Sequence, residues 1–301
     1  MSTCAHAHVL VTGASSGIGR ATALRLATSG YHVFAGVRKP ADGAALTEAA
    51  AGNVTPVILD VTDAQQIASA VELVAGHVGN AGLAGLVNNA GIGVFGPLEL
   101  IPIEQFRRQL EVNVTGQLAI TQAALPLLRR ARGRIVMIGS IGTRFTPPFI
   151  GPLAATKSTL TTMSTALRQE LAPWDIRVTV VEPGSIRSEA VDKLEGDARA
   201  VMSETTPEGR ALYESAFLHL VGFFVGLHEK GSRPEFVART VERALRASRP
   251  RSRYLSGKNA RRMATVARLL PVPAQDALRR RLARQPAPGS LAVAEAGDGG
   301  D

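Results

Sequence analysis

Short apolar segments alternate with longer segments of helical periodicity from residue 8 to about residue 183. The apolar segments are rich in Val, Ile and Leu, which is typical of strands that are buried on both faces. The alternation predicts a doubly wound parallel sheet with right-handed crossovers and helices on both faces. Strands are expected at 8–11, 32–37, 57–59, 86–87, 134–138 and 177–181, and helices at 20–29, 64–75, 103–128 and 153–171.

The rhythm changes after the sixth predicted strand. Residues 189–230 contain no clear strand and predict a helical insertion that acts as a lid. A helix is expected at 234–247 with Ser232 as its N-cap, and a seventh strand is expected at 253–256. Basic helices are expected at about 258–285.

The chain shows no internal repeat and no interdomain linker. We therefore expect one domain over residues 1–285, although 301 residues are enough for two smaller domains. The tail at 286–301 is rich in Pro, Ala, Gly and acidic residues and is expected to be disordered. Hydrophobic residues make up 45% of the chain and charged residues 20%, which is typical of a soluble globular protein.

Three features bear on the compartment. Cys4 is the only cysteine, so an internal disulfide is excluded and a reducing, cytoplasmic setting is expected. Residues 1–8 lack a basic segment followed by an apolar one, so we expect no secretion signal. The longest apolar stretch, 217–227, is shorter than a membrane-spanning helix requires, so we expect no transmembrane segment.

The net charge of +9 is concentrated near the C-terminus. Residues 246–284 carry eleven Arg and one Lys against the single acid Asp276. Such a block fits a nucleic acid, an anionic membrane or an acidic partner. With Tyr254 as its only aromatic residue it is a poor stacking surface, and we expect no nucleic-acid partner. We favour a solvated surface whose helix covers the edge of the domain through Met263, Val266 and Leu269.

A glycine-rich segment follows the first predicted strand directly. It reads Thr-Gly-Ala-Ser-Ser-Gly-Ile-Gly over residues 12–19 and opens the first helix. Glycines at such a turn let the backbone approach a pyrophosphate closely, and the helix start offers free N–H groups to it. This position in a strand–helix unit predicts a dinucleotide site. The candidate contacts are Gly13, Ser15, Ser16, Gly17, Ile18 and Gly19.

The end of the second strand selects between the two nicotinamide dinucleotides. An acid there would bind the adenosine ribose of NAD, but this chain has Val37, Arg38 and Lys39, with no acid before Asp42. A guanidinium suits a 2′-phosphate. We therefore predict NADP(H), with Arg38 as the selective residue.

With further motifs, these residues resemble the short-chain dehydrogenase/reductase family over about residues 8–257. The motifs are Asp60-Val61, Asn88-Asn89-Ala90-Gly91, Asn113, Ser140, Lys157 and Pro183-Gly184 with Ser188. Residues 168–174 and Arg253-Tyr254 are similar to the branch with 17β-hydroxysteroid and retinol dehydrogenases. The resemblance implies a Rossmann-type fold that forms a homodimer or homotetramer through the helix with Lys157.

The resemblance also implies roles for individual residues. Ser140 would position the substrate oxygen, Lys157 would hold the nicotinamide ribose, and Asn113 would hold a water beside Lys157. The remaining cofactor contacts it implies are Asp60, Val61, Asn89, Ala90, Gly91, Pro183, Gly184, Ile186 and Ser188.

One position departs from the family pattern. The family has a Tyr thirteen residues after the Ser and four before the Lys, but this chain has Leu153 there. A spacing of four puts positions 153 and 157 on one helical face, and leucine has no proton to donate. General acid catalysis contributes about 10²–10⁴-fold to a rate, so its loss need not end the reaction.

Four explanations are open. In the first, the substrate supplies the proton from a phenol or enol beside its ketone. In the second, the electrophile is an iminium or an enone, for which protonation of an oxygen matters less. In the third, another group of the protein donates the proton: Thr143, Thr156, His219 or a water on Lys157. In the fourth, the chain is a non-catalytic NADP(H)-binding scaffold or sensor. We favour ketone reduction with substrate assistance, because Ser140 is kept as an oxygen partner.

The insertion predicts the kind of ligand. Its apolar segment 217–225 and the loop 145–149 suit a bulky lipophilic or aromatic small molecule, such as a polyketide of secondary metabolism. A subunit interface or plain core packing is the alternative. No spacing of His, Cys, Asp or Glu predicts a metal site. The candidate substrate contacts are Ser140, Phe145, Leu153, His219 and Phe223.

Overall fold

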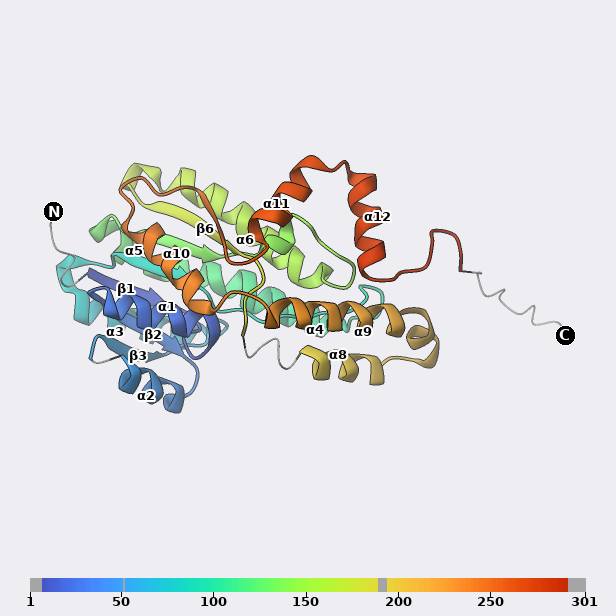
Figure 1. Ribbon diagram of the computed structural model, residues 1–301. Coiled ribbons are helices and arrows are strands. Elements are labelled where there is room, and N and C mark those ends of the chain that lie inside the picture. Colours follow the sequence, from blue (N-terminus) through green and yellow to red (C-terminus); the bar gives the residue numbers. More distant parts are fainter. Residues whose placement is uncertain (1–6, 51, 189–193, 292–301) are drawn as a thin grey trace.

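A seven-stranded parallel sheet forms the centre of the molecule (Figure 1). The computed structural model describes residues 7–50, 52–188 and 194–291. All six strand pairs are parallel, in the order β3-β2-β1-β4-β5-β6-β7. The predicted doubly wound fold with seven strands is therefore confirmed. The strands are β1 Ala7–Val11, β2 Tyr31–Val37, β3 Val54–Ile58, β4 Gly85–Asn88, β5 Arg134–Ile138, β6 Arg177–Pro183 and β7 Arg253–Ser256.

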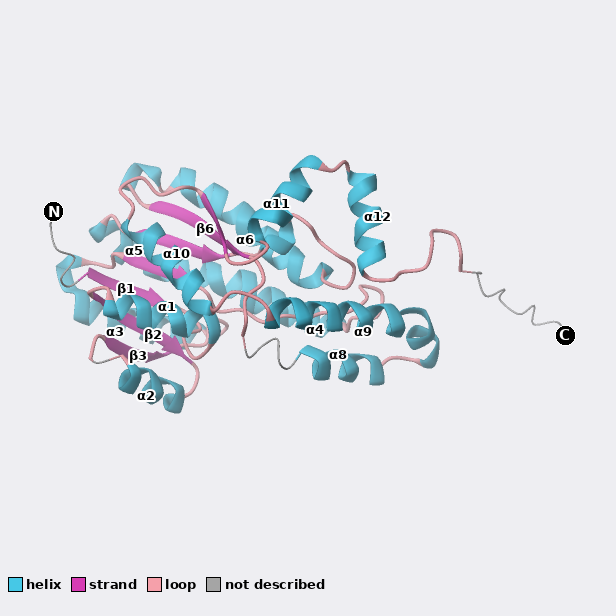
Figure 2. Cartoon of the chain, viewed as in Figure 1, coloured by secondary structure: helices cyan, strands magenta, loops and turns pink. Residues whose placement is uncertain are grey.

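Helices cover both faces of this sheet (Figure 2). Successive side chains of a strand point to opposite faces, so Val9 and Val11 enter one hydrophobic cluster and Leu10 the other. The first cluster packs against α1 Gly17–Thr28, α2 Pro40–Ala49 and α10 Pro234–Arg246. The second packs against α3 Ala64–Val78, α5 Gly116–Ala131 and α6 Gly151–Glu170.

The helical zone expected at 103–128 is interrupted. It consists of α4 Ile103–Leu110, a π-helical turn Glu111–Thr115, and α5. Pro126 lies inside α5, as the sequence indicated. A single π turn inside a helix frequently marks a functional site, and this one contains Asn113.

Four helices lie together beyond the end of the sheet, to the right in Figure 1. α8 Leu194–Ser203 and α9 Pro207–Glu229 confirm the helical insertion, and residues 189–193 of that prediction lie outside the described residues. α11 Ala260–Leu269 and α12 Val272–Leu282 are the basic C-terminal helices. A third hydrophobic cluster joins α8, α9 and Ala283 to Phe149.

α9 is longer than the apolar stretch 217–227 from which no membrane-spanning segment was expected. Its 23 residues have a mean hydropathy of 1.3, and by length and composition it could cross a membrane. Five of its residues are nevertheless buried in this fold, among them Phe217 and Leu220. By length and composition alone, the expectation of no membrane-spanning segment therefore does not hold for α9.

Two expectations about local structure were wrong, and one helix, α2, was not foreseen. Ser232 does not cap α10, because its hydroxyl oxygen accepts a bond from the backbone N–H of Lys258 at 3.0 Å. Leu269 does not cover the edge of the sheet but is 72% exposed, while Met263 and Val266 are half-buried. Of the tail predicted to be disordered, residues 286–291 have no helix or strand, and 292–301 lie outside the described residues.

Candidate active site

The site lies where the carboxyl ends of the parallel strands meet the glycine loop, the place at which such sheets bind ligands. Gly13 has a φ of +62°, and a Cβ atom there would lie 2.8 Å from the Cα of Ala90. A Cβ on Gly19 would collide with the carbonyl oxygen of Gly13 and the amide nitrogen of Asn89. The loop and the Asn89-Ala90 segment are thus packed backbone to backbone, as a pyrophosphate cradle requires.

Side-chain hydrogen bonds hold this cradle in shape. The Nδ2 of Asn89 donates to the carbonyl oxygens of Thr12 and Gly13 at 3.0 and 2.9 Å. The Oγ1 of Thr12 accepts bonds from the backbone N–H groups of Asn89 and Ala90, both at 3.0 Å. Ser15 and Ser16 are exposed on the loop, and Gly17 and Ile18 begin α1. Asn89 therefore holds the glycine loop in place, and its expected contact with a cofactor stays a prediction.

Arg38 and Asp60 follow neighbouring strands, β2 and β3. Arg38 is exposed, whereas Val61 is buried. Burial raises the pKa of Asp60, but hydrogen bonds from Thr62 and the nearby Arg38 guanidinium outweigh it and leave the pKa below its usual range. The exposed Arg38 guanidinium thus lies near the carboxylate of Asp60, the other residue here that is expected to contact the cofactor.

The segment after β6 lies against the same loop. A Cβ atom on Gly17 would lie 3.9 Å from the Cβ of Ser188, so the two ends of the predicted cofactor site face each other. The backbone N–H of Gly184, next to Pro183, donates to Ser256 of β7 at 2.8 Å. Ile186 is buried in the first hydrophobic cluster, so its side chain serves packing as well as any ligand.

Lys157 projects from α6 toward β5. Its Nζ donates to the carbonyl oxygen of Ile138 at 2.8 Å. Burial lowers the pKa of Lys157 from 10.5 to about 8. A Cβ atom on Gly91 would lie 3.6 Å from this Nζ and 3.2 Å from the Oδ1 of Asn113, so these three residues meet.

Asn113 is fully buried in the π turn. Its Oδ1 accepts a bond from the N–H of Ile92 at 2.8 Å, and its Nδ2 donates to the carbonyl oxygen of Ile92 at 2.9 Å. The Nδ2 also donates to the Oγ1 of Thr156 at 3.1 Å. The Asn113 side chain therefore holds the segment between β4 and α4 in place. Because it is fully buried, we expect it to position its neighbours, Lys157 among them.

Ser140 follows β5 and is half-buried. Its Oγ accepts a bond from the N–H of Gly142 at 3.0 Å, which fixes the side chain, while its own O–H donates to no partner among the described residues. That hydrogen can be given to a ligand oxygen. Leu153, on α6, is half-buried and presents only hydrocarbon.

Two of the substitutes considered for the missing tyrosine are engaged elsewhere. The hydroxyl of Thr143 donates to the carbonyl oxygen of Ser140 at 3.0 Å. The hydroxyl of Thr156 donates to the carbonyl oxygen of Leu153 at 2.9 Å and is fully buried. Neither proton is free for a substrate, which narrows the protein's own sources to His219 or a water on Lys157.

The predicted substrate contacts are dispersed. Phe145 is buried beneath the Arg279 guanidinium, 4.7 Å from its ring centroid. Phe223 packs edge-on against Phe224, and His219 is half-buried on α9. Within the described chain, no hydrogen bond or ring contact joins His219 or Phe223 to Ser140. The two apolar segments expected to face a ligand, 145–149 and 217–225, contact each other directly through Phe149 and Phe217, with 5.4 Å between the ring centroids and both side chains buried.

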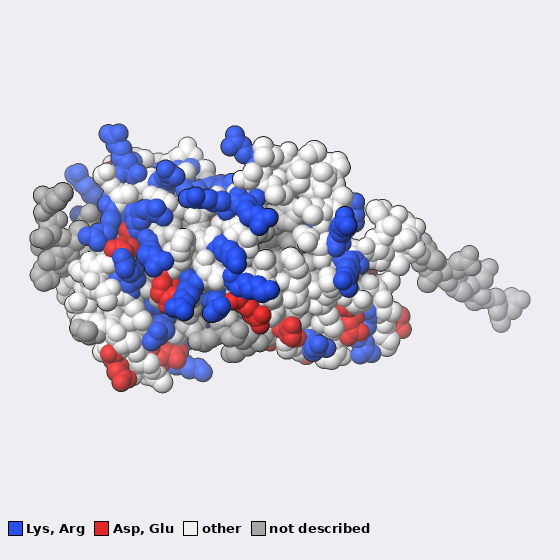
Figure 3. All heavy atoms as spheres, in the orientation of Figure 1, with Lys and Arg blue, Asp and Glu red and all other residues white. Residues whose placement is uncertain are grey.

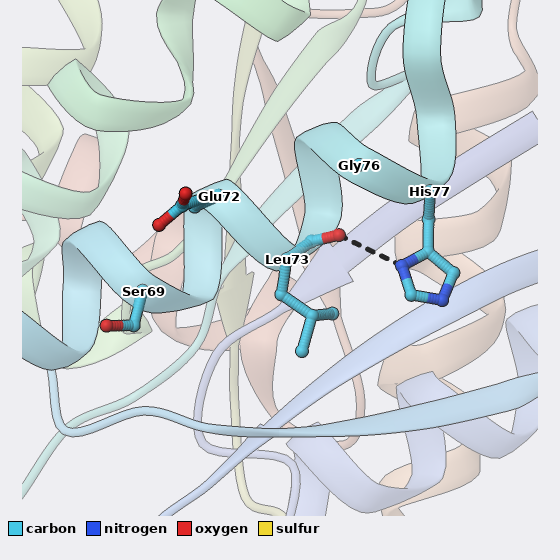
Figure 4. Close-up of a pocket in the computed structure, with 5 residues that line it drawn as sticks. All are labelled: Ser69, Glu72, Leu73, Gly76 and His77. Atoms are coloured by element: carbon cyan, nitrogen blue, oxygen red, sulfur yellow. Dashed lines mark hydrogen bonds between the residues drawn. The ribbon is translucent and has the colours of Figure 1, made fainter.

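Two hollows on the described part of the chain differ in their lining. One of about 530 Å³ lies on the outside of α3, and Figure 4 shows its five lining residues on that single helix, with the His77 ring bonded to the carbonyl of Leu73. It offers no converging polar groups. The other, about 250 Å³, lies between residues 93–95, Gln105 of α4 and one face of α8. This second hollow is bordered by the insertion, and its lining mixes apolar side chains with Gln105, Asp197 and Glu204.

An ion-pair triad behind the site was also missed. Glu182, at the end of β6, is fully buried and binds Arg144 at 2.8 Å and Arg253 at 3.4 Å. Arg144 lies four residues after Ser140, so the triad ties the serine loop to β6 and β7. The signal available in the sequence was an acid directly after the apolar run 178–181.

Comparison with known proteins gives one consistent answer. A family model described as short chain dehydrogenase matches residues 7–199. The chain is 35% identical to retinol dehydrogenase 5 of Mus musculus over 281 residues, 90% of this chain and 87% of that protein. It is 33% identical over 253 residues to an NADPH-dependent 3-dehydrocapnine reductase of Ornithobacterium rhinotracheale, 82% of this chain and 87% of that protein.

A bacterial relative and a solved structure agree with this. A 3-amino-tetrahydro-pyrrolizinone reductase of Xenorhabdus hominickii is 33% identical over 266 residues, 88% of this chain and 91% of that protein. A short-chain dehydrogenase of Streptomyces avermitilis superimposes with a TM-score of 0.71 and 28% identity, over 93% of this chain and 95% of that one.

Proposed function

The chain belongs to the short-chain dehydrogenase/reductase family and is an oxidoreductase, and from that premise we propose that it uses NADPH to reduce the ketone of a bulky lipophilic or aromatic substrate. In this proposal the substrate, and not a tyrosine, supplies the proton. The observation that carries the proposal is that Lys157 lies beside Asn113 and reaches the end of β5, the strand that Ser140 follows, while position 153 on the same helix is a leucine.

The residues present fit a dinucleotide. The backbone packing at Gly13 and Gly19 leaves no room for a side chain, and a loop of bare backbone at a helix start is what a pyrophosphate needs for close approach to N–H groups. Proteins of this family bind NAD(P)(H), and the exposed Arg38 after β2 favours the phosphorylated form. A relative whose name includes NADPH dependence supports the same choice. When bound, the cofactor supplies the hydride.

The protein's own part is to bind and to orient. The O–H of Ser140 donates to the carbonyl oxygen of the substrate and fixes it beside Leu153. The ammonium of Lys157 adds positive charge to the site as negative charge develops on that oxygen. As the carbonyl carbon accepts the hydride, the oxygen takes a proton from the adjacent phenol or enol O–H, and the resulting phenolate regains a proton from water.

A hydrocarbon at position 153 suits this chemistry. An internal hydrogen bond already partners the carbonyl oxygen of such a substrate, so a phenol from the protein would compete with it. The apolar loop 145–149 and the apolar segment 217–225 lie together in the fold, joined through Phe149 and Phe217, and support an apolar ligand.

The test is NADPH oxidation by the purified protein with matched pairs of ketones. Each pair is an aryl ketone with an adjacent phenol and the methyl ether of the same compound, and the panel also contains a cyclic iminium and an enone. We expect turnover of the phenols and none of the ethers. Equal turnover of both members would sink the substrate-assisted mechanism.

Two other results would redirect the assignment. Turnover confined to the iminium or the enone would identify a reductase that needs no oxygen protonation. Tight NADPH binding with no turnover of any compound would identify a non-catalytic binding protein. Binding is followed separately by the fluorescence of NADPH, so a failure of binding is not mistaken for a failure of chemistry.

Cofactor choice has its own test. Arg38→Ser removes the charge expected to meet the 2′-phosphate, and we expect the Kd for NADPH to rise by about 10–100-fold, as for loss of a charged hydrogen bond. The Kd for NADH is expected to change little. Arg107→Ser, on exposed α4, is the control and should alter neither. Equal weakening of both dinucleotides by Arg38→Ser would contradict the assignment.

A further inference from the structure

We propose that the turn between α11 and α12 docks the protein on the surface of an anionic lipid bilayer. Four large apolar side chains here lie within ten residues of sequence and face solvent. They are Leu269, 72% exposed, Val272, 64%, and Leu270 and Leu278, each 37%. We call these four residues the apolar corner.

The apolar corner is surrounded by positive charge. Six arginines flank it on the two helices and just beyond, and within the described residues none of the six forms an ion pair. The acid of this segment, Asp276, is bound to Arg279 at 2.9 Å. In Figure 3, an uncharged surface where Figure 1 places α11 and α12 is bordered by Lys and Arg side chains. The six are Arg261, Arg262, Arg268, Arg280, Arg281 and Arg284.

This combination fits lipid better than a protein partner. The strong contacts of protein interfaces centre on Trp, Tyr and Arg seated in pockets, but residues 260–284 contain no Trp, Tyr or Phe, and their arginines surround aliphatic side chains that protrude. An interfacial helix instead buries aliphatic side chains at the acyl boundary while its arginines reach the phosphates. The two helices project from the body of the protein (Figure 1), as insertion into a headgroup layer requires.

The apolar corner is held outward by its own structure. The Nε2 of the buried Gln275 donates to the carbonyl oxygens of Ala267 and Leu270, at 3.0 and 2.9 Å, which ties α12 to the end of α11. Further along α12, Arg279 covers Phe145, and Ala283 is buried in the cluster with Phe149. Docking would thus bring the loop that follows Ser140 close to the bilayer.

The experiment is co-sedimentation of the full chain with vesicles, which needs neither cofactor nor substrate. Vesicles of phosphatidylcholine alone are compared with vesicles that also contain phosphatidylglycerol. The test variant is Leu269→Ser with Val272→Ser, and a second variant is Arg261→Glu with Arg262→Glu. The controls are Ile58→Ser, on the far edge strand β3, and Arg130→Glu, on α5.

We expect the unaltered protein to sediment with the anionic vesicles, and less so at about 1 M salt, where screening shortens electrostatic reach to about 3 Å. Each double variant should bind at least about tenfold more weakly, and the controls should bind as the unaltered protein does. Circular dichroism and NADPH fluorescence check that every variant is folded.

Three results would overturn the proposal. The first is that the unaltered protein stays in the supernatant with both kinds of vesicle, as expected if the apolar corner binds a protein partner or a second copy. The second is that the double variants bind the anionic vesicles as tightly as the controls do. The third is that the protein binds neutral and anionic vesicles equally, which would leave the arginines without a role.

Discussion

At the scale of single residues, the chemistry depends on two positions one helical turn apart on α6. Lys157 reaches the carbonyl of Ile138, and Leu153 lies on the same side of the helix with nothing to donate. The nearby hydroxyls of Thr143 and Thr156 are bound to backbone carbonyls. The sources left for a proton on the product oxygen are therefore the ligand, His219 and water.

Leu153→Tyr places a phenol beside the Lys157 ammonium. We expect new turnover of plain ketones, at least about 10²-fold above the unaltered protein, because a general acid contributes about 10²–10⁴-fold. Turnover of the phenol-bearing ketones should rise little. Leu153→Phe, which adds the ring without the hydroxyl, is the matched control and should gain nothing. A large gain on the phenol-bearing ketones would count against substrate assistance.

The pKa of Lys157 sets a pH dependence. Burial lowers it from 10.5 to about 8, so the ammonium is mostly charged below pH 8 and mostly neutral above it. We expect kcat for NADPH oxidation to be level below that pH and to fall as pH rises through it. Lys157→Arg keeps its charge over this range, so its lower kcat should not show the fall. A fall at the same pH in both proteins would assign it to another group.

At the scale of elements, the Glu182 triad connects three of them: the loop after β5, and strands β6 and β7. Its carboxylate is fully buried, while Arg144 and Arg253 are partly exposed. Such a link gives the serine loop a rigid support. It also makes Glu182 the ion-pair residue whose loss the fold should tolerate least.

Glu182→Gln removes the charge and keeps the shape. We expect the free energy of unfolding to fall by about 1–3 kcal/mol, as for loss of hydrogen bonds to charged groups. Asp175→Asn breaks an exposed pair with Arg177 and should cost less than about 1 kcal/mol. Urea unfolding of the two variants measures both values, and equal losses would mean that the buried pair has no special weight.

The elements that were foreseen share a physical cause. Strands that are buried on both faces have continuous apolar sequences, so β5 and β6 could be predicted. Two residues four apart on one helix lie on the same face wherever that helix packs, so the pairing of positions 153 and 157 could be predicted as well. The glycine loop was predictable for the same local reason.

The elements that were missed depend on tertiary contacts. Helix α2 buries only Gly43 and Leu46, so its sequence carries no apolar stripe, and close packing of Gly43 on Pro56 fixes its place. The π turn at 111–115 leaves no trace in periodicity. Leu269 continues the apolar face of Met263 and Val266, but the helix ends there and the side chain meets solvent.

At the scale of the whole molecule, cofactor binding is coupled to stability. A ligand that binds only the folded state at about a hundred times its Kd adds about 2.7 kcal/mol to the free energy of unfolding. We expect NADPH to stabilise the protein by this amount. Gly19→Ala should lose the gain, because its Cβ would displace the Gly13 carbonyl or the Asn89 amide.

Gly76→Ala is the control for this prediction. A Cβ there meets nothing within 4 Å on α3, so the variant should keep the NADPH effect and gain about 0.4–1 kcal/mol of its own. Thermal unfolding with and without NADPH measures both. An undiminished NADPH effect in Gly19→Ala would show that the cofactor binds elsewhere.

Leu153 also bears on direction, through microscopic reversibility. The group that protonates an oxygen in one direction must remove that proton in the other, and here the protein provides no such group at position 153. Under the proposed mechanism, oxidation of an ordinary secondary alcohol would have to rely on His219 or a water on Lys157, whatever the ratio of oxidised to reduced cofactor. An alcohol that carries its own acceptor, the phenolate left by the forward step, would return along the same path without either group.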